Sequence, residues 1–211
     1  MKVAVRVLAE LAPDYVLAPE RHVLAAGAVQ AGDGVPLGEL VVERRERIDP
    51  QTAADAVVLD TTHARDGILD VAGALRDGAG TKSAKKRVAA GDLVVSRLRP
   101  YLRQIALVHA SALAIAGARP LALSTEFYVL AARDADDDLA FLVPFLLSAD
   151  TQAALAGAQE GGHHPRVPRS SLFALRVPRA VLRTRARVSR AMNEALAETY
   201  RASSRLRGLL G

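Results

Sequence analysis

The pattern of hydrophobic positions predicts a mixed α/β domain built from short strands. Residues 2–8 alternate between polar and apolar side chains, which predicts an edge strand. The alanine-rich residues 19–30 predict a short helix that ends before a glycine pair. Compact apolar runs predict further short strands at residues 36–42, 56–59, 68–71, 93–96, 105–108, 126–130 and 172–177. For residues 36–42, a short helical turn is the alternative.

Two longer stretches have helical spacing. Residues 139–155 predict a helix that is kinked or broken at Pro144, and the acidic residues 134–138 are placed to cap it. Residues 180–206 contain neither glycine nor proline and predict an amphipathic helix of about seven turns. We expect a domain over residues 1–177 and, over 178–211, a helix for dimerisation or partner-subunit binding. The apolar positions expected to face that partner are Val181, Val188, Met192, Leu196 and Leu206.

Positive charge is concentrated in two parts of the chain. The net charge is +5, from 28 Lys and Arg against 23 Asp and Glu. Residues 163–211 hold many arginines and only two acids, Glu194 and Glu198, and residues 82–103 form a second basic island. Clustered arginine on an otherwise balanced chain is typical of a phosphate-rich partner. A genome-wide preference for arginine codons is the alternative explanation.

The basic segments supply candidate DNA contacts. A loop between two predicted strands presents arginines that can bind phosphate or guanine, and a glutamine that can read adenine. A lysine-rich cluster upstream suits backbone phosphates, and a loop after two glycines can approach a groove. A solvated charged surface is the alternative for each segment. The candidate residues are Lys82, Lys85, Lys86, Arg87, Arg97, Arg99, Arg103, Gln104, Ser124, Thr125, His163, His164, Arg166 and Arg169.

Catalytic and metal-binding signatures are missing from the sequence. There is no cysteine, no Gly-x-Ser-x-Gly motif and no Walker loop, so we expect no catalysis and no cofactor. Adjacent His163 and His164 have no carboxylate at ligand spacing, and we expect no metal. His63 near Asp60 and Asp66 is more typical of a surface loop than of a hydrolase.

We expect a cytoplasmic protein without a membrane partner. The absence of cysteine fits a reducing compartment. Residues 1–7 lack the apolar run of a signal peptide, and the longest apolar stretch, residues 139–147, is too short to span a bilayer.

Several segments, taken in order, resemble a known family. They are VPLGEL at 35–40, GDLVVSR at 91–97, LSTEFYVL at 123–130, a glycine loop at 159–167 and LFALRVP at 172–178. Their order and spacing are similar to those of the target-recognition domain of a type I restriction–modification specificity subunit, in a single-domain, half-subunit form.

This resemblance implies a sequence-specific module that binds double-stranded DNA. Such a module serves a restriction–modification or related anti-phage defence or methylation system. It directs a separate DNA methyltransferase subunit, and a restriction subunit can join the complex. Full specificity subunits have two recognition domains and two helices, so one of each implies either a homodimer through the helix or a role in a different system. The alternative is a protein-interaction or scaffold module that has this fold but does not read DNA.

Overall fold

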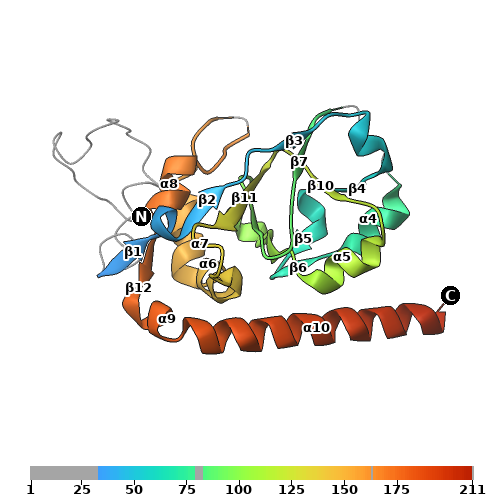
Figure 1. The fold of residues 1–211 in the computed structure, drawn as a ribbon. Helices are drawn as coiled ribbons and strands as arrows, with labels where there is room; N and C mark the ends of the chain where they lie inside the picture. The colour runs from blue at the N-terminus through green and yellow to red at the C-terminus, as the bar shows by residue number, and fades with distance from the viewer. Residues whose placement is uncertain (1–32, 79–82, 163, 211) are drawn as a thin grey trace.

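The structure is a computed structural model that describes residues 33–78, 83–162 and 164–210 (Figure 1). It has a mixed α/β architecture in which short strands form several small sheets and a long helix follows at the C-terminus. The predicted fold class is therefore confirmed. The strand predicted at residues 2–8 and the helix predicted at 19–30 lie outside the described residues.

The first sheet forms the centre of the hydrophobic core. Its two middle strands are buried along most of their length, because side chains on both faces are apolar. Tyr128 pairs with Val95, and Phe127 with Ser96. The strands predicted at 93–96, 105–108 and 126–130 are confirmed here. The sheet is antiparallel, and its strands in spatial order are β2 (Val41–Glu43), β11 (Phe127–Ala132), β8 (Leu93–Ser96) and β9 (Ile105–Leu107).

The remaining strands form a second four-stranded sheet and two small ribbons. The strand Lys85–Arg87 was not predicted, because its sequence is entirely charged, yet Lys86 is buried. The second sheet has the order β3 (Arg47–Ile48), β7 (Lys85–Arg87), β10 (Leu121–Leu123) and β4 (Val57–Leu59), of which only the last pair is parallel. The ribbons are β1 (Gly34–Pro36) with β12 (Arg176–Pro178), and β5 (Ala64–Arg65) with β6 (Ile68–Leu69).

Short helices connect these strands. The α-helices are α3 (Leu37–Leu40), α4 (Val71–Asp77), α5 (Ala110–Ala116), α6 (Leu142–Leu146), α7 (Ala149–Gly157), α8 (Arg169–Ala174), α9 (Arg179–Arg183) and α10 (Arg185–Leu210). The 3-10 turns are η2 (Thr52–Asp55), η3 (Thr61–His63), η4 (Pro100–Leu102) and η5 (Leu139–Phe141).

Three local predictions were wrong in detail. The chain does not break at Pro144, which lies in the first turn of α6, where its missing N–H costs no hydrogen bond. It bends instead by 74° just before α7, where the Ser148 side chain caps the next helix. The strand predicted at 68–71 ends at Leu69, and Val71 instead begins α4, a helix that was not predicted and whose first turn Asp70 caps. Residues 172–174, predicted as strand, end α8 instead.

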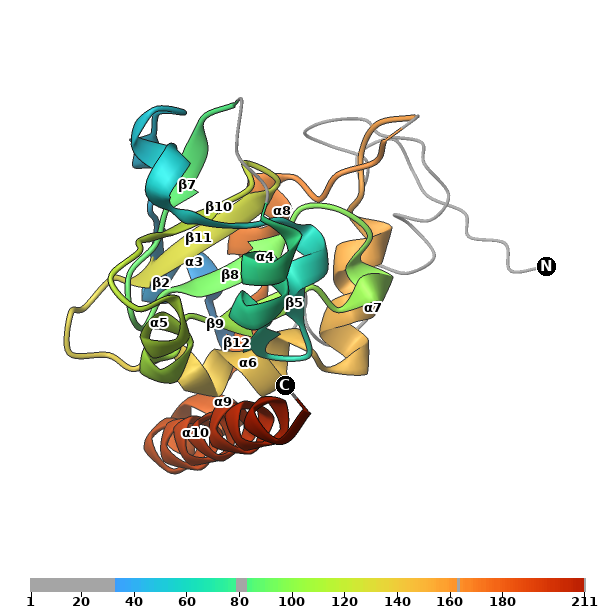
Figure 2. The same cartoon turned by 90° about the vertical axis from the view of Figure 1, so that its right-hand side faces the viewer.

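The C-terminal helix lies along one side of the domain, next to η5 and α5 (Figures 1 and 2). It is interrupted at Thr184, which separates α9 from α10. Ser189 accepts a hydrogen bond from the Phe141 N–H at 3.2 Å, and the Asn193 amide donates to Asp138 at 2.7 Å. Asp138 also caps η5, as the acidic-turn prediction stated.

The predicted assembly positions of this helix contact this chain's own domain, with one exception. Leu196 is buried, and the other covered positions pack partly against the core. The exception is Leu206, which is 57% exposed. That residues 178–211 form a separate assembly element stays a prediction. The covered positions are Val181, Val188, Met192 and Leu196.

Within the described ranges no single helix is long and apolar enough to cross a membrane, although the bent pair Leu139–Leu146 and Ala149–Gly157 would be, by length and composition alone, if its two helices are taken together.

Candidate nucleic-acid interface

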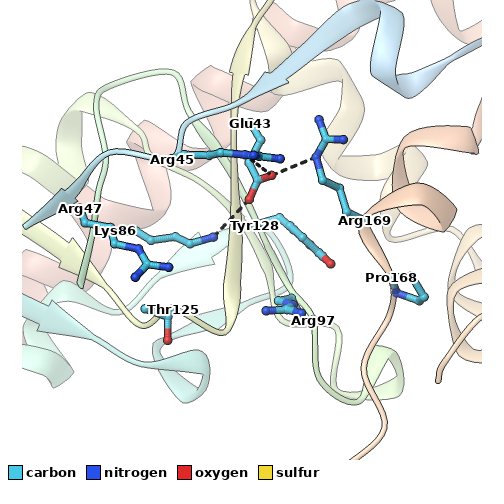
Figure 3. Close-up of a pocket in the computed structure, with 9 residues that line it drawn as sticks. All are labelled: Glu43, Arg45, Arg47, Lys86, Arg97, Thr125, Tyr128, Pro168 and Arg169. Atoms are coloured by element: carbon cyan, nitrogen blue, oxygen red, sulfur yellow. Dashed lines mark hydrogen bonds and ion pairs between the residues drawn. The ribbon is translucent and has the colours of Figure 1, made fainter. Parts of the chain in front are cut away.

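A basic groove of about 600 Å³ lies where the two four-stranded sheets and α8 meet (Figure 3). Its side chains come from the run that joins the end of β2 to the start of β3, from β7, from the residue after β8, from the turn before β11 and β11 itself, and from the start of α8. Five of these side chains are cationic and one is a carboxylate. The lining consists of Glu43, Arg45, Arg47, Lys86, Arg97, Thr125, Tyr128, Pro168 and Arg169.

The carboxylate of Glu43 lies among three of the cations. Its Oε2 atom is 3.0 Å from Arg169 Nε and 3.2 Å from Arg45 Nε, and its Oε1 atom is 3.4 Å from Lys86 Nζ. The Glu43 side chain is only 9% exposed, so these interactions are screened less than ordinary surface pairs. One acid therefore fixes cations from three separate elements.

Two cations lie over the ring of Tyr128. Lys86 Nζ lies 5.8 Å and the Arg97 guanidinium 5.3 Å from the ring centroid, within the range of cation–π attraction. The Tyr128 hydroxyl donates to the Val167 carbonyl at 2.9 Å, and burial raises its pKa. Lys86 Nζ also donates to the Phe127 carbonyl at 2.6 Å, and burial lowers the pKa of this lysine.

Arg97 has an unused donor. Its Nε atom is buried and has no hydrogen-bond partner among the described residues. Leaving such a donor unpaired costs free energy.

Hydrogen bonds of Arg166 and Val167 hold the loop after α7 beside the groove. Arg166 forms a bidentate pair with Glu126, at 2.6 and 2.9 Å, and this pair lowers the pKa of Glu126. The Val167 N–H donates to the Arg97 carbonyl at 2.9 Å. The loop is therefore held against the segment that follows β8, and its arginine already has a protein partner.

The structure brings four of the predicted DNA-contact residues into the groove: Lys86, Arg97, Thr125 and Arg169. Their neighbours Lys85 and Arg87 flank Lys86 on β7, and the exposed Arg87 lies 3.5 Å from Glu46.

The other predicted contacts lie outside the groove lining. Arg103 is held by Asp66 and by the Leu147 carbonyl, and Gln104 is buried. Arg99 is exposed at the start of η4, and the Ser124 hydroxyl accepts from the Glu126 N–H at 3.3 Å.

Two predicted contacts, Lys82 and His163, fall on residues that the structure does not describe. His164 is described and is exposed.

Sequence reasoning missed the carboxylate and the aromatic ring of the groove. Arg45, Arg47 and Glu43 belong to a charged run directly after an apolar strand, and this run was the available signal. Tyr128 gave no signal, because it reads as an ordinary strand residue. Across the described ranges, no group of three or more metal-ligating side chains is arranged to hold a metal ion.

Comparisons with known proteins identify the fold. No protein-family model matches the sequence, and no curated protein matches it. Solved structures with similar folds come from type I restriction–modification systems. The chain therefore has the fold of a specificity subunit, and the resemblance found in the sequence is confirmed at that level.

Two of these structures are particularly informative. One is the HsdS subunit from Thermoanaerobacter tengcongensis, 24% identical with a TM-score of 0.50. The other belongs to a study of complex assembly and conformational transition of the type I restriction–modification system, 24% identical with a TM-score of 0.55. Each match covers 84% of this chain and 45% of the other, so this chain spans less than half the length of either neighbour.

Proposed function

We propose that this protein is a specificity module that binds double-stranded DNA in the basic groove and catalyses no reaction itself. The observation that carries the proposal is the groove, where five cationic side chains surround one carboxylate. The fold shared with HsdS subunits supports it. DNA presents regularly spaced phosphates, and a concave basic surface raises the local concentration of such a partner.

Phosphate contacts and base contacts have different roles in this mechanism. Arg45 and Arg47 are exposed at the groove and neutralise phosphates, which provides affinity that falls with salt. Arg97 and Thr125 approach base edges, where a well-aligned bidentate contact discriminates by about 1–3 kcal/mol. Exposed residues of the adjacent loops, such as Arg99, complete the contact.

We further infer that the module directs a separate enzyme. Its partners are a DNA methyltransferase subunit and a restriction subunit of a cytoplasmic restriction–modification or related anti-phage defence system. The exposed end of α10 is the proposed assembly surface, since Leu206, Leu209 and Leu210 are 57%, 84% and 78% exposed. A second copy of the chain can bind there, which gives a homodimer with two recognition domains.

The groove can be tested by removing its two most exposed cations. The variant Arg45→Ala/Arg47→Ala takes away positive charge with little cost to folding, since both residues are exposed and the ion pair of Arg45 with Glu43 lies at the surface end of that side chain. We expect weaker binding to duplex DNA and a salt dependence shallower by up to about 1.8, because each lost phosphate contact removes about 0.9.

The matched control is Arg76→Ala/Arg183→Ala, which removes the same charge from exposed positions on α4 and α9 outside the groove. It should bind DNA with nearly the wild-type salt dependence. Equal losses in the two double variants would show that the net charge matters and the groove does not.

A further inference from the structure

We propose that Glu43 is a positioning residue that determines specificity: its carboxylate holds the groove cations in one arrangement and weakens binding to unselected DNA. The inference rests on the proposed function, because it concerns how the same groove discriminates between duplexes. It explains why an acid occupies the centre of a surface expected to bind a polyanion.

The position of Glu43 allows it to join separate parts of the fold. It lies at the end of β2, paired with Leu130 of β11. From there its carboxylate contacts Lys86 on β7 of the second sheet and Arg169 in the first turn of α8 (Figure 3). The third partner, Arg45, is 71% exposed. Removing this carboxylate would break all three ion pairs at once.

The ion pairs of Glu43 are not the only contacts that hold these cations. Lys86 also donates to the Phe127 carbonyl at 2.6 Å, and Arg169 stacks on the Phe173 ring at 4.0 Å. Because Lys86 and Arg169 have these second anchors, a neutral side chain at position 43 leaves both near the groove. The charge of Glu43 therefore acts mainly on what the groove binds.

A negative charge in the groove disfavours phosphates that come close without matching contacts. Sequence-independent binding to DNA is almost entirely electrostatic, so an interior acid reduces it selectively. Contacts to base edges depend instead on the geometry of the donors, and Arg97, the arginine proposed to read bases, has no ion pair with Glu43. Opposing the wrong complex more strongly than the right one is a common route to specificity.

The cations of the groove thus fall into two sets. Glu43 holds Arg45, Lys86 and Arg169, whereas Arg47 and Arg97 have no ion pair with it in the structure. Arg97 Nε is the buried donor that has no partner among the described residues.

The test compares Glu43→Gln with wild type on two duplexes: one recovered by selection from a randomised pool, and a scrambled version of it. At low salt, scrambled-duplex affinity should rise by about threefold to tenfold, with a salt dependence steeper by about 0.9, since the groove gains one net positive charge for phosphate. The ratio of selected to scrambled affinity should fall by a similar factor of about threefold to tenfold, because binding that rests on charge alone gains more than binding that also rests on base contacts.

Glu46→Gln is the matched control. It removes the same charge three residues away, from a side chain that is 59% exposed and does not line the groove. The affinity ratio should stay at the wild-type value. Glu43→Asp is a second variant, which keeps the charge; its affinity for the scrambled duplex should remain as low as that of wild type, and a clear increase overturns the inference.

The two proposals fail in different ways. If wild type binds neither duplex at low salt, the proposed function is wrong, and the inference falls with it. If wild type discriminates but Glu43→Gln shows an unchanged affinity ratio, the inference alone is wrong. Thermal unfolding of each variant identifies a loss of binding that comes merely from loss of folding; in that case the Glu43→Asp result decides.

Discussion

The hydroxyl of Tyr200 provides a sharp test of how α10 docks on the domain. Tyr200 is 5% exposed, and its hydroxyl accepts from the Leu69 N–H at 3.0 Å and donates to the Leu69 carbonyl at 3.2 Å. Its ring stacks on His109, with centroids 6.0 Å apart. The substitution Tyr200→Phe removes one oxygen and leaves the ring packing in place.

The expected loss follows from these two hydrogen bonds. Each buried hydrogen bond contributes about 1 kcal/mol, so Tyr200→Phe should lower the free energy of unfolding by about 2 kcal/mol. Burial raises the pKa of Tyr200 above its usual value of 10.0, so the hydroxyl remains protonated and able to donate across the neutral range. The loss should therefore be the same at every pH in that range.

Urea unfolding followed by far-ultraviolet circular dichroism measures this loss. Arg201→Ala is the matched control, since the next residue on the same helix is exposed and should change stability by less than about 0.5 kcal/mol. Both proteins should unfold in a single transition. A Tyr200→Phe loss as small as that of the control, or separate unfolding of the helix, would refute the docking described here.

Two further predictions concern the core and a surface ion pair. Gly67→Ala should lower the free energy of unfolding by about 1–3 kcal/mol, because φ is +92° and the added Cβ would lie 2.9 Å from Met192 Cε and 3.1 Å from Val143 Cγ1; a neutral effect in thermal unfolding contradicts this. Arg166 lowers the pKa of Glu126 below its usual 4.5, so their pair stabilises the fold fully above that pH and loses its effect as the pH falls through the lower folded-state pKa. The difference in free energy of unfolding between wild type and Glu126→Gln should therefore become smaller in acid. A difference that stays constant with pH would contradict this prediction.

The parts of the fold that could be predicted are those whose burial shows in local composition. Strands β8 and β11 have consecutive apolar residues, which identify a buried strand without knowledge of its neighbours. Strand β7 could not be found in this way, because the contacts of the buried Lys86 are with the Phe127 carbonyl and the Tyr128 ring, which are distant in the sequence. Such contacts cannot be predicted from local composition.

The same limit applies to the candidate site. Arg97 and Arg169 could be predicted from charge clustering, since several arginines in a loop are visible in the sequence. The role of Glu43 could not, because its partner Arg169 lies 126 positions away. For α10, periodicity correctly predicts an apolar face, but it cannot say whether this chain or a partner covers that face.

Selection from a randomised pool of duplex DNA, repeated across a salt series, tests the central claim most directly. The proposed function predicts binding that weakens steeply with salt and enriches one short sequence motif; a split palindromic motif would additionally support the homodimer. The Arg45→Ala/Arg47→Ala variant should recover less DNA at every salt concentration. Absence of binding at low salt would contradict the claim and favour the scaffold alternative, in which the fold is kept without DNA recognition.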